Sequence, residues 1–369
     1  MSGRTTDEAN QGAGSSGSPD SSGGHGNAGD SGSAGTADTT EVSRAELAAA
    51  GRGQPTAPSA SPGMSRRRAM ACLAWAGAGI LWTLDGGVPR GVSFGTQALA
   101  ATGAPAGNAL SFVQISDSHI GFNKAPNPDP ASTLKSAIER IRSAPQRPAF
   151  MLHTGDVSHL SRPAEFDTAQ QIVTGAGLET HYVPGEHDVI GDDGRAFFSR
   201  FSPDTKGLGW YSFDQNGVHF VALVNVLNLK AGGMGYLGDT QLAWLANDLK
   251  GRSHSTPLVV FTHMPLWTVY PAWGWGTDDG DRALALLRPF GSVTVLNGHI
   301  HQVLQKVEGN VRLQTAMSTA FPQPAPGDGP GPGPKQVDPS QLRQTLGIRR
   351  VDFTALDGTP LLADTTLAS

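Results

Sequence analysis

Cysteine is almost absent from this chain of 369 residues, which contains only Cys72. A single cysteine can form no internal disulfide and no metal site built from several thiolates. Positive charge is also scarce, because residues 101–369 hold 20 Lys and Arg against 24 Asp and Glu. This balance gives no excess of basic residues that could bind nucleic acid, so a nucleic-acid partner is not expected.

Residues 1–63 lack aromatic side chains and have almost no large aliphatic ones beyond Val42 and Leu47. They consist mainly of Gly, Ser, Ala, Thr and Asp, so they cannot bury enough apolar surface to offset the entropy lost on folding. We expect residues 1–63 to be a disordered leader. Because a signal peptide normally begins a chain, an alternative hypothesis is that translation starts at Met64 and the leader is a start-site artefact.

Residues 64–100 have the features of an export signal. Three arginines, Arg66 to Arg68, precede a moderately apolar stretch at residues 69–84, and an Ala-Leu-Ala sequence ends at Ala100. We interpret this segment as a twin-arginine signal peptide, recognised by the twin-arginine export machinery and cleaved near Ala100. The alternative is a membrane-spanning helix, but the stretch is shorter than the roughly 20 residues that a bilayer core needs. The sequence thus predicts a periplasmic or extracellular protein with no stable membrane span after cleavage.

From about Leu110, short apolar runs alternate with amphipathic stretches, which is typical of an α/β fold. Hairpin signals near residues 214–217, 308–310 and 357–360 indicate antiparallel strands as well as parallel ones. A loop rich in Pro and Gly covers residues 322–334. The expected strands are 110–115, 149–152, 181–183, 257–261 and 293–296, and the expected helices are 130–141, 163–173, 238–249 and 281–287.

Carboxylates and imidazoles recur where five of these apolar strands end. Ligands bind at the carboxyl ends of strands in open α/β sheets, and these side chains bind first-row metals without thiolates. Each of these motifs alone is weak evidence for a metal site, because an isolated Asp-x-His is more often a turn carboxylate beside a surface histidine. Together they are numerous enough for two ions. The residues are Asp117, His119, Asp156, Glu186, His187, Asp188, His263, His299 and His301.

This ordered set is similar to the five motifs of the calcineurin-like metallophosphoesterase superfamily. The resemblance covers Leu110 to about Met317 and includes the stretch Gln241 to Leu249, which resembles the family helix before the fourth motif. It implies a four-layer α-β-β-α sandwich of two mixed β-sheets flanked by helices, formed by residues 101–369. The matching motifs read Asp-Ser-His119, Gly-Asp156, Gly-Glu-His-Asp188, His263 and Gly-His-Ile-His301.

The resemblance also implies roles for these residues. Asp117, His119 and His301 would hold one metal ion, and Glu186, His263 and His299 the other, with Asp156 bridging them. The ions would be two divalent or trivalent cations of Fe, Mn or Zn. His187 would protonate the leaving group, oriented by Asp188. The implied activity is hydrolysis of a phosphomonoester or phosphodiester by a metal-activated water, with a small-molecule phosphate ester as substrate.

One position departs from the family pattern, because Glu186 stands where the third motif normally has asparagine. A carboxylate at this position lowers the net charge of a two-cation site from about +1 to about zero, which weakens its attraction for phosphate and strengthens its hold on metal. One hypothesis makes Glu186 a ligand in a variant phosphoesterase. The other is that the site has drifted toward another metal preference or slow catalysis.

Substrate choice leaves few traces in the sequence. Trp267, Tyr270, Trp273 and Trp275 form an aromatic loop after the fourth motif. They are candidates for stacking on a substrate, and the alternative is that they pack over the sheet edge. Lys124 and His159 follow the first two motifs and are weaker candidates for phosphate contact. A second candidate function is a metal-binding or sensing protein on the same scaffold, with weak or no hydrolase activity.

Overall fold

The computed structural model describes residues 80–85, 88–93, 110–205, 208–353 and 358–368. The chain divides into two compact units, Met1–Leu99 and Ala100–Ser369. In the first unit, β1 (Ile80–Asp85) and β2 (Val88–Ser93) pair as an antiparallel hairpin. The predicted leader at 1–63 and most of the predicted export signal at 64–100 lie outside the described residues.

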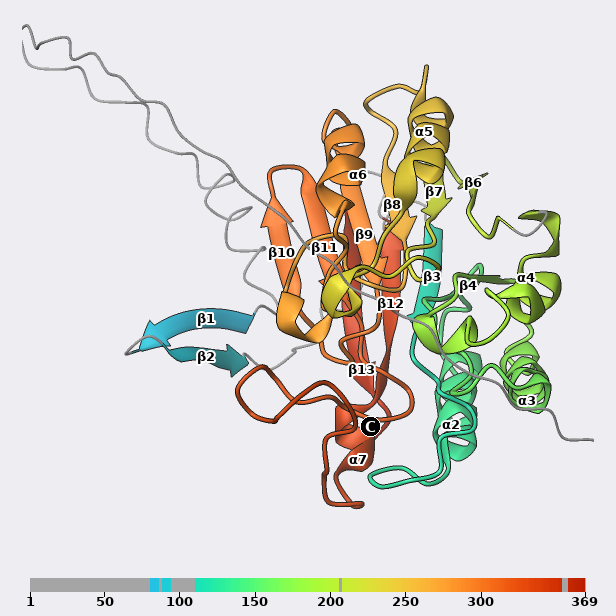
Figure 1. Ribbon diagram of the computed structural model, residues 1–369, viewed down its shortest axis with the longest axis vertical. Coiled ribbons are helices and arrows are strands. Elements are labelled where there is room, and N and C mark those ends of the chain that lie inside the picture. Colours follow the sequence, from blue (N-terminus) through green and yellow to red (C-terminus); the bar gives the residue numbers. More distant parts are fainter. Residues whose placement is uncertain (1–79, 86–87, 94–109, 206–207, 354–357, 369) are drawn as a thin grey trace, which may run out of the picture. The chain divides into compact units, whose positions relative to one another are not determined.

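The second unit contains two mixed β-sheets (Figure 1). The first has six strands in the order β10-β11-β9-β8-β7-β6, of which β7, β8, β9 and β11 run parallel and the two edge strands antiparallel. Its strands are β6 (Tyr211–Gln215), β7 (Val218–Ala222), β8 (Leu258–Phe261), β9 (Val293–Asn297), β10 (Gln305–Glu308) and β11 (Val311–Thr315).

The second sheet has five strands in the order β13-β12-β3-β4-β5. The strands β3, β4 and β5 are parallel, β12 runs antiparallel to β3, and β13 runs antiparallel to β12. The strands are β3 (Leu110–Ile115), β4 (Met151–His153), β5 (Thr180–Tyr182), β12 (Gly347–Phe353) and β13 (Pro360–Thr366).

Helices cover the outer faces of both sheets. Figure 1 shows α2, α3 and α4 beside β3 and β4, and α5 and α6 beside β7, β8 and β9. The α2 helix begins where Pro130 follows the N-cap Asp129, whose side chain accepts a hydrogen bond from the Ser132 amide. The helices are α2 (Pro130–Arg142), α3 (Pro163–Thr174), α4 (Arg195–Phe201), α5 (Gly238–Leu249), α6 (Gly280–Leu287) and the short α7 (Leu342–Thr345).

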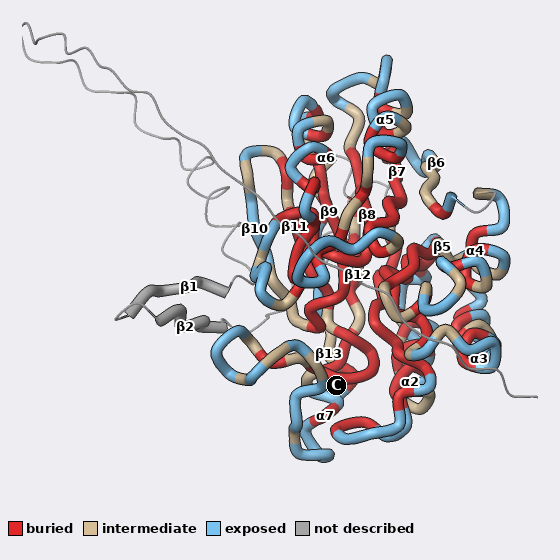
Figure 2. The backbone as a smooth tube through the Cα atoms, in the orientation of Figure 1, coloured by how far each residue is buried: buried red, intermediate tan, exposed pale blue. Residues whose placement is uncertain are grey.

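Three apolar cores join these layers. Between the sheets, Phe112 and Phe150 stack on each other and meet Phe220 of the opposite sheet edge-on. One outer core packs α2, α3 and α4 on the five-stranded sheet, and another packs α5 and α6 on the six-stranded sheet. The central strands β7, β8 and β9 are accordingly buried on both faces, whereas the edge strand β10 and one side of each long helix are exposed (Figure 2). The predicted four-layer α-β-β-α sandwich is confirmed.

The expected helices and strands of this unit form, with small shifts at their ends. The strand predicted at 149–152 is observed at Met151–His153, and the one predicted at 181–183 at Thr180–Tyr182. The sequence did not indicate α4, a helix of 7 residues in which Phe197 and Phe198 are adjacent and show no helical spacing. Within the described part of the chain, no helix combines the length and the apolar character needed to cross a membrane.

A buried histidine and two aspartates link the hairpin of β6 and β7 to α5. The ring of His219 is fully buried, and its two nitrogens lie 2.9 Å from an oxygen of Asp214 and 2.7 Å from an oxygen of Asp248. Burial raises the pKa of Asp248, but hydrogen bonds from His219 and Ser212 outweigh it and lower the pKa overall. The carboxylate form is therefore the one that the fold stabilises.

We expect Asp248→Asn to lower the free energy of unfolding at pH 7 by about 1–2 kcal/mol, because His219 loses a charged acceptor. The folded-state pKa of Asp248 is depressed, so its contribution is present at neutral pH and is lost as the pH falls through that pKa, below about 4. Denaturant unfolding from pH 7 to pH 3 should show that the difference in the free energy of unfolding between the wild type and Asp248→Asn becomes smaller in acid. The exposed Asp204, changed to Asn, is the control; a difference that persists at pH 3 would contradict the account.

Candidate functional site

The predicted site residues lie in loops at the carboxyl ends of β3, β4, β5, β8 and β9. These loops are joined by backbone hydrogen bonds. The amides of Asp117 and His119 donate to the carbonyls of Gly155 (3.0 Å) and Asp156 (2.8 Å), and the amide of Gly298 donates to the carbonyl of His263 (3.0 Å). Parallel strands therefore bring motifs from both sheets into one cluster.

The backbone at this cluster is unusual. Positive φ angles are uncommon outside glycine, yet five of the predicted metal ligands have them. Such conformations cost energy and tend to gather at functional sites. The angles are 53° at Asp117, 41° at His119, 52° at Asp156, 69° at His299 and 57° at His301.

Two glycines let the loops approach closely. Gly155 has a φ of 96°, and a Cβ there would lie 2.4 Å from the ring of His263. A Cβ on Gly298 would lie 2.0 Å from the hydroxyl of Ser116 and 2.4 Å from a carboxylate oxygen of Asp117. No larger residue fits at either position without moving the site residues apart.

The first predicted triad is assembled and buried. The Nε2 atom of His301 lies 3.2 Å from Oδ1 of Asp117 and 3.3 Å from Nε2 of His119. The Nδ1 atom of His301 donates to the carbonyl of Phe321 (2.6 Å), which fixes the proton on Nδ1. Its Nε2 lone pair is thus free to face the other two residues, as in a metal-ligating histidine.

The second predicted triad is also assembled. The two carboxylate oxygens of Glu186 lie 2.8 Å from Nε2 of His263 and 3.0 Å from Nδ1 of His299. His263 donates from Nδ1 to the carbonyl of Thr154 (2.8 Å). Yet Nε2 of His263, both ring nitrogens of His299 and Oε2 of Glu186 are buried without a partner in hydrogen-bonding geometry. These nitrogen and oxygen atoms lie close together without hydrogen-bond partners, an arrangement that is typical of metal ligands.

Asp156 lies between the triads. Its Oδ2 atom is 3.4 Å from Nε2 of His119 and 3.4 Å from Nε2 of His263. Its Oδ1 atom accepts a hydrogen bond from the backbone amide of His187 (2.9 Å), which fixes the carboxylate. One oxygen therefore faces both triads, the position that a bridging ligand requires.

The electrostatics of the cluster favour positive charge. Burial raises the pKa of Asp117, but His301 and His263 outweigh it and hold the pKa at about 2. Burial lowers the pKa of His263, yet Asp156 and Glu186 raise it well above its ordinary value. Burial and the neighbouring His187 and His301 push the pKa of His119 well below its ordinary value, so this ring is neutral. Carboxylates and imidazoles are ligands for first-row cations, and within the described residues both triads have their ligand atoms within 4.8 Å of one another.

The hydrogen-bond partners of Asp188 differ from the expected one, the ring of His187. Its carboxylate accepts hydrogen bonds from the amides of Val157 (2.9 Å), Ser158 (2.7 Å) and Gly185 (3.0 Å) and from the hydroxyl of Ser158. The ring of His187 is instead oriented by the carbonyl of His159, which accepts from Nδ1 at 2.7 Å. The expectation that Asp188 orients His187 is therefore wrong; Asp188 ties the second and third motif loops together. Burial and Asp156 raise its pKa to about 7, against the lowering effect of the backbone donors.

A cavity of about 650 Å³ opens onto the site. His119, Glu186, His187 and His299 are among the residues that line it. Its remaining wall is largely apolar and includes a Pro-Gly-Pro segment of the loop at 322–334, and among the described lining residues Lys124 is the one with a permanent positive charge. The apolar lining residues are Phe122, Ala125, Leu229, Met264, Trp273, Phe321, Pro332 and Pro334.

The aromatic loop contributes one side chain to this cavity. Trp273 lines it, and Tyr270, which is 36% exposed, packs edge-on against Trp273. Trp267 and Trp275 are 7% and 1% exposed, so they pack inside the fold, as the alternative in the sequence analysis proposed. Phe122 and Phe321 also line the cavity, and neither was predicted, because no motif distinguishes them from ordinary core residues.

The comparisons with known proteins agree with this geometry. A family model described as calcineurin-like phosphoesterase matches residues 110–303, more than half of the chain. The chain therefore belongs to the calcineurin-like phosphoesterase family. The structure of a purple acid phosphatase from yellow lupin shares the fold, with a TM-score of 0.53 and 12% identity over 71% of this chain and 52% of that one.

Two relatives with named activities are more similar in sequence. A 3',5'-cyclic-nucleotide phosphodiesterase of Nostoc sp. is 26% identical over 219 residues, which cover 58% of this chain and 79% of the relative. A glycerophosphodiester phosphodiesterase of Enterobacter lignolyticus is 24% identical over 196 residues, 51% of this chain and 68% of the relative.

We expect the chain, stripped of metal by a chelator, to bind two Mn²⁺ ions in a calorimetric titration. His301→Ala should abolish one of them, because its imidazole completes the first triad. Glu186→Asn should keep both ions but weaken one, because an amide replaces a charged ligand in the second triad. His254→Ala, a change at an exposed histidine, is the control. Unaltered binding in His301→Ala would contradict the assignment.

Proposed function

We propose that this chain is an exported phosphodiesterase that uses two metal ions, one in each triad. The observation that carries the proposal is Oδ2 of Asp156, which is equally distant from an imidazole of either triad at 3.4 Å. Membership of a phosphoesterase family supports the reaction class. The names of both relatives support the diester, since one is a cyclic-nucleotide and the other a glycerophosphodiester phosphodiesterase.

The residues divide the chemistry between them. The cations would activate a water molecule and neutralise charge on the phosphoryl oxygens. The water oxygen bonds to phosphorus as the bond to the leaving alkoxide breaks, and the products are a phosphomonoester and an alcohol. His187 donates a hydrogen bond from Nδ1 to the carbonyl of His159, so in its imidazolium form the second proton is on Nε2 and passes from there to the leaving oxygen.

The cavity favours a substrate with one negative charge and an apolar organic group. Trp273 and the proline-containing segment at 332–334 offer apolar surface for a base, an aryl group or a lipid portion. Lys124 alone would face additional phosphates, which makes a polyphosphate a poor fit. A diester carries one charge at phosphorus, so it also suits a metal site that Glu186 brings close to neutral.

Glu186 enters this proposal as a ligand in place of the family asparagine. Its two oxygens face the two imidazoles of the second triad, at 2.8 Å and 3.0 Å, which supports the hypothesis of a variant phosphoesterase. The competing function, a protein that only binds metal or ligand on this scaffold, needs no proton donor. The placement of His187 at the cavity favours the hydrolase.

Turnover of a substrate panel tests the proposal. With Mn²⁺, Fe²⁺ or Zn²⁺ added, we expect aryl phosphodiesters and cyclic nucleotides to be hydrolysed faster than the aryl phosphomonoester and nucleoside triphosphates. His187→Ala should lower kcat for a diester with a poor leaving group by about 10²–10⁴-fold, because the leaving oxygen loses its proton donor. Bound metal should stay at two ions per chain. Absence of turnover with every metal, in a chain that binds both ions, would favour the binding protein.

Export is the part of the proposal that rests on the arginines at 66–68 and the apolar stretch after them. We expect the mature protein to begin near residue 101 and to be found outside the cytoplasm. Changing Arg66 and Arg67 to Lys should retain the precursor inside the cell. N-terminal sequencing of the exported protein measures where the mature chain begins. An exported chain that still carries residues before 64 would contradict the predicted cleavage.

A further inference from the structure

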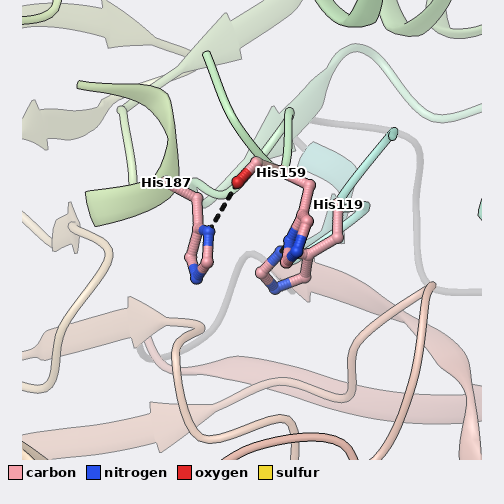
Figure 3. Close-up of side chains that lie close together, drawn as sticks. All are labelled: His119, His159 and His187. Carbon is pink, nitrogen blue, oxygen red and sulfur yellow. Dashed lines mark hydrogen bonds between the residues drawn. The ribbon is translucent and has the colours of Figure 1, made fainter. Parts of the chain in front are cut away.

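The ring of His159 lies against two site histidines that come from other loops. Its Nδ1 atom is 3.4 Å from Nδ1 of His119, and its backbone carbonyl accepts the hydrogen bond from His187. The rings of His159 and His187 stack with centroids 4.8 Å apart and an interplanar angle of 15° (Figure 3). His159 follows Asp156 by three residues, so the same loop supplies the bridging carboxylate and this imidazole.

The arrangement fixes where the protons sit. Nε2 of His119 faces Oδ2 of Asp156 at 3.4 Å and Nε2 of His301 at 3.3 Å, inside the first triad. A histidine that ligates a cation through Nε2 carries its proton on Nδ1. Nδ1 of His119 must then donate toward His159, and Nδ1 of His159 must accept.

The acceptor of the Nδ1 proton differs between His119 and two other site histidines. His263 and His301 donate from Nδ1 to the backbone carbonyls of Thr154 and Phe321. His119 donates instead to the side chain of His159. A side-chain acceptor, unlike a backbone carbonyl, can be removed by mutation. The ring of His159 is also held in place, because its amide donates to the carbonyl of Ile120 (2.9 Å) and Phe122 packs edge-on against it.

We propose that His159 is a positioning residue for the metal ligand His119, accepting its Nδ1 proton and thereby fixing the tautomer and ring orientation that the first triad needs. This inference rests on the proposed function, since it assigns His119 to a cation. It assigns to His159 a part in assembling the first triad that the motif pattern does not indicate.

Substitutions at position 159 separate the hydrogen bond from the bulk of the ring. His159→Asn places an amide oxygen near the position of Nδ1 and keeps the acceptor. His159→Gln places its amide further out, near the position of Nε2, and His159→Ala removes both. His181→Asn is the matched control, because His181 is likewise partly buried and stacks on an aromatic ring, that of Phe213, but lies on β5 away from the site.

The measurement is the affinity for Mn²⁺ in a His299→Ala background, which keeps the first triad intact and disables the second. We expect His159→Ala and His159→Gln to weaken binding about 10–100-fold, and His159→Asn to stay within about threefold of the parent. Melting temperatures, compared with His181→Asn, show whether each variant is folded. In the otherwise unchanged chain, kcat should follow metal affinity across the three variants.

Two results would overturn the inference. One is unchanged affinity in His159→Ala. The other is an equal loss in all three folded variants, which would show that the ring is needed for its shape and not for its acceptor. These outcomes are distinct from failure of the proposed function, because metal binding is measured without substrate. A wild-type chain that binds no cation would overturn both.

Discussion

A single carboxylate oxygen, Oδ2 of Asp156, faces imidazoles that follow strands of two different sheets. His119 follows β3 of the five-stranded sheet, and His263 follows β8 of the six-stranded sheet. With Asp117 and Glu186 close by, this places three carboxylates in a largely buried cluster, which costs energy unless positive charge is supplied. The negative charge of Asp156 and Glu186 accounts for the raised pKa of His263, and the unpartnered ring nitrogens of His263 and His299 are available to a cation.

Backbone groups keep the cluster in place. Carbonyls of Thr154, His159 and Phe321 each accept the Nδ1 proton of a site histidine, and the carboxylate of Asp188 gathers three amides from the second and third motif loops. The imidazoles are thus oriented before any ligand arrives, which is the condition for precise metal binding. The strain of the left-handed residues is offset by this network and by the apolar layers beneath it.

The sequence was sufficient to predict the architecture and the composition of the cluster. Apolar runs ending in Asp, His and Glu predicted the strands and the ligand types, and the resemblance to the phosphoesterase family supplied the four-layer sandwich and the grouping into triads. Backbone acceptors could not be predicted, because any residue has a carbonyl and only folding selects Phe321 or His159. The role of Asp188 was inferred from the family resemblance, but in the 3₁₀ turn at Glu186–Asp188 its carboxylate accepts hydrogen bonds from backbone amides and not from the ring of His187. Burial of Trp267 and Trp275 likewise follows from packing that an aromatic-rich loop does not reveal.

The most direct test of the central claim is anomalous diffraction from crystals of residues 101–369 grown with Mn²⁺. The account predicts two anomalous peaks, one within bonding distance of His119 and His301 and the other of His263 and His299, with Asp156 contacting both. A single peak, or ions bound without Asp156, would contradict it.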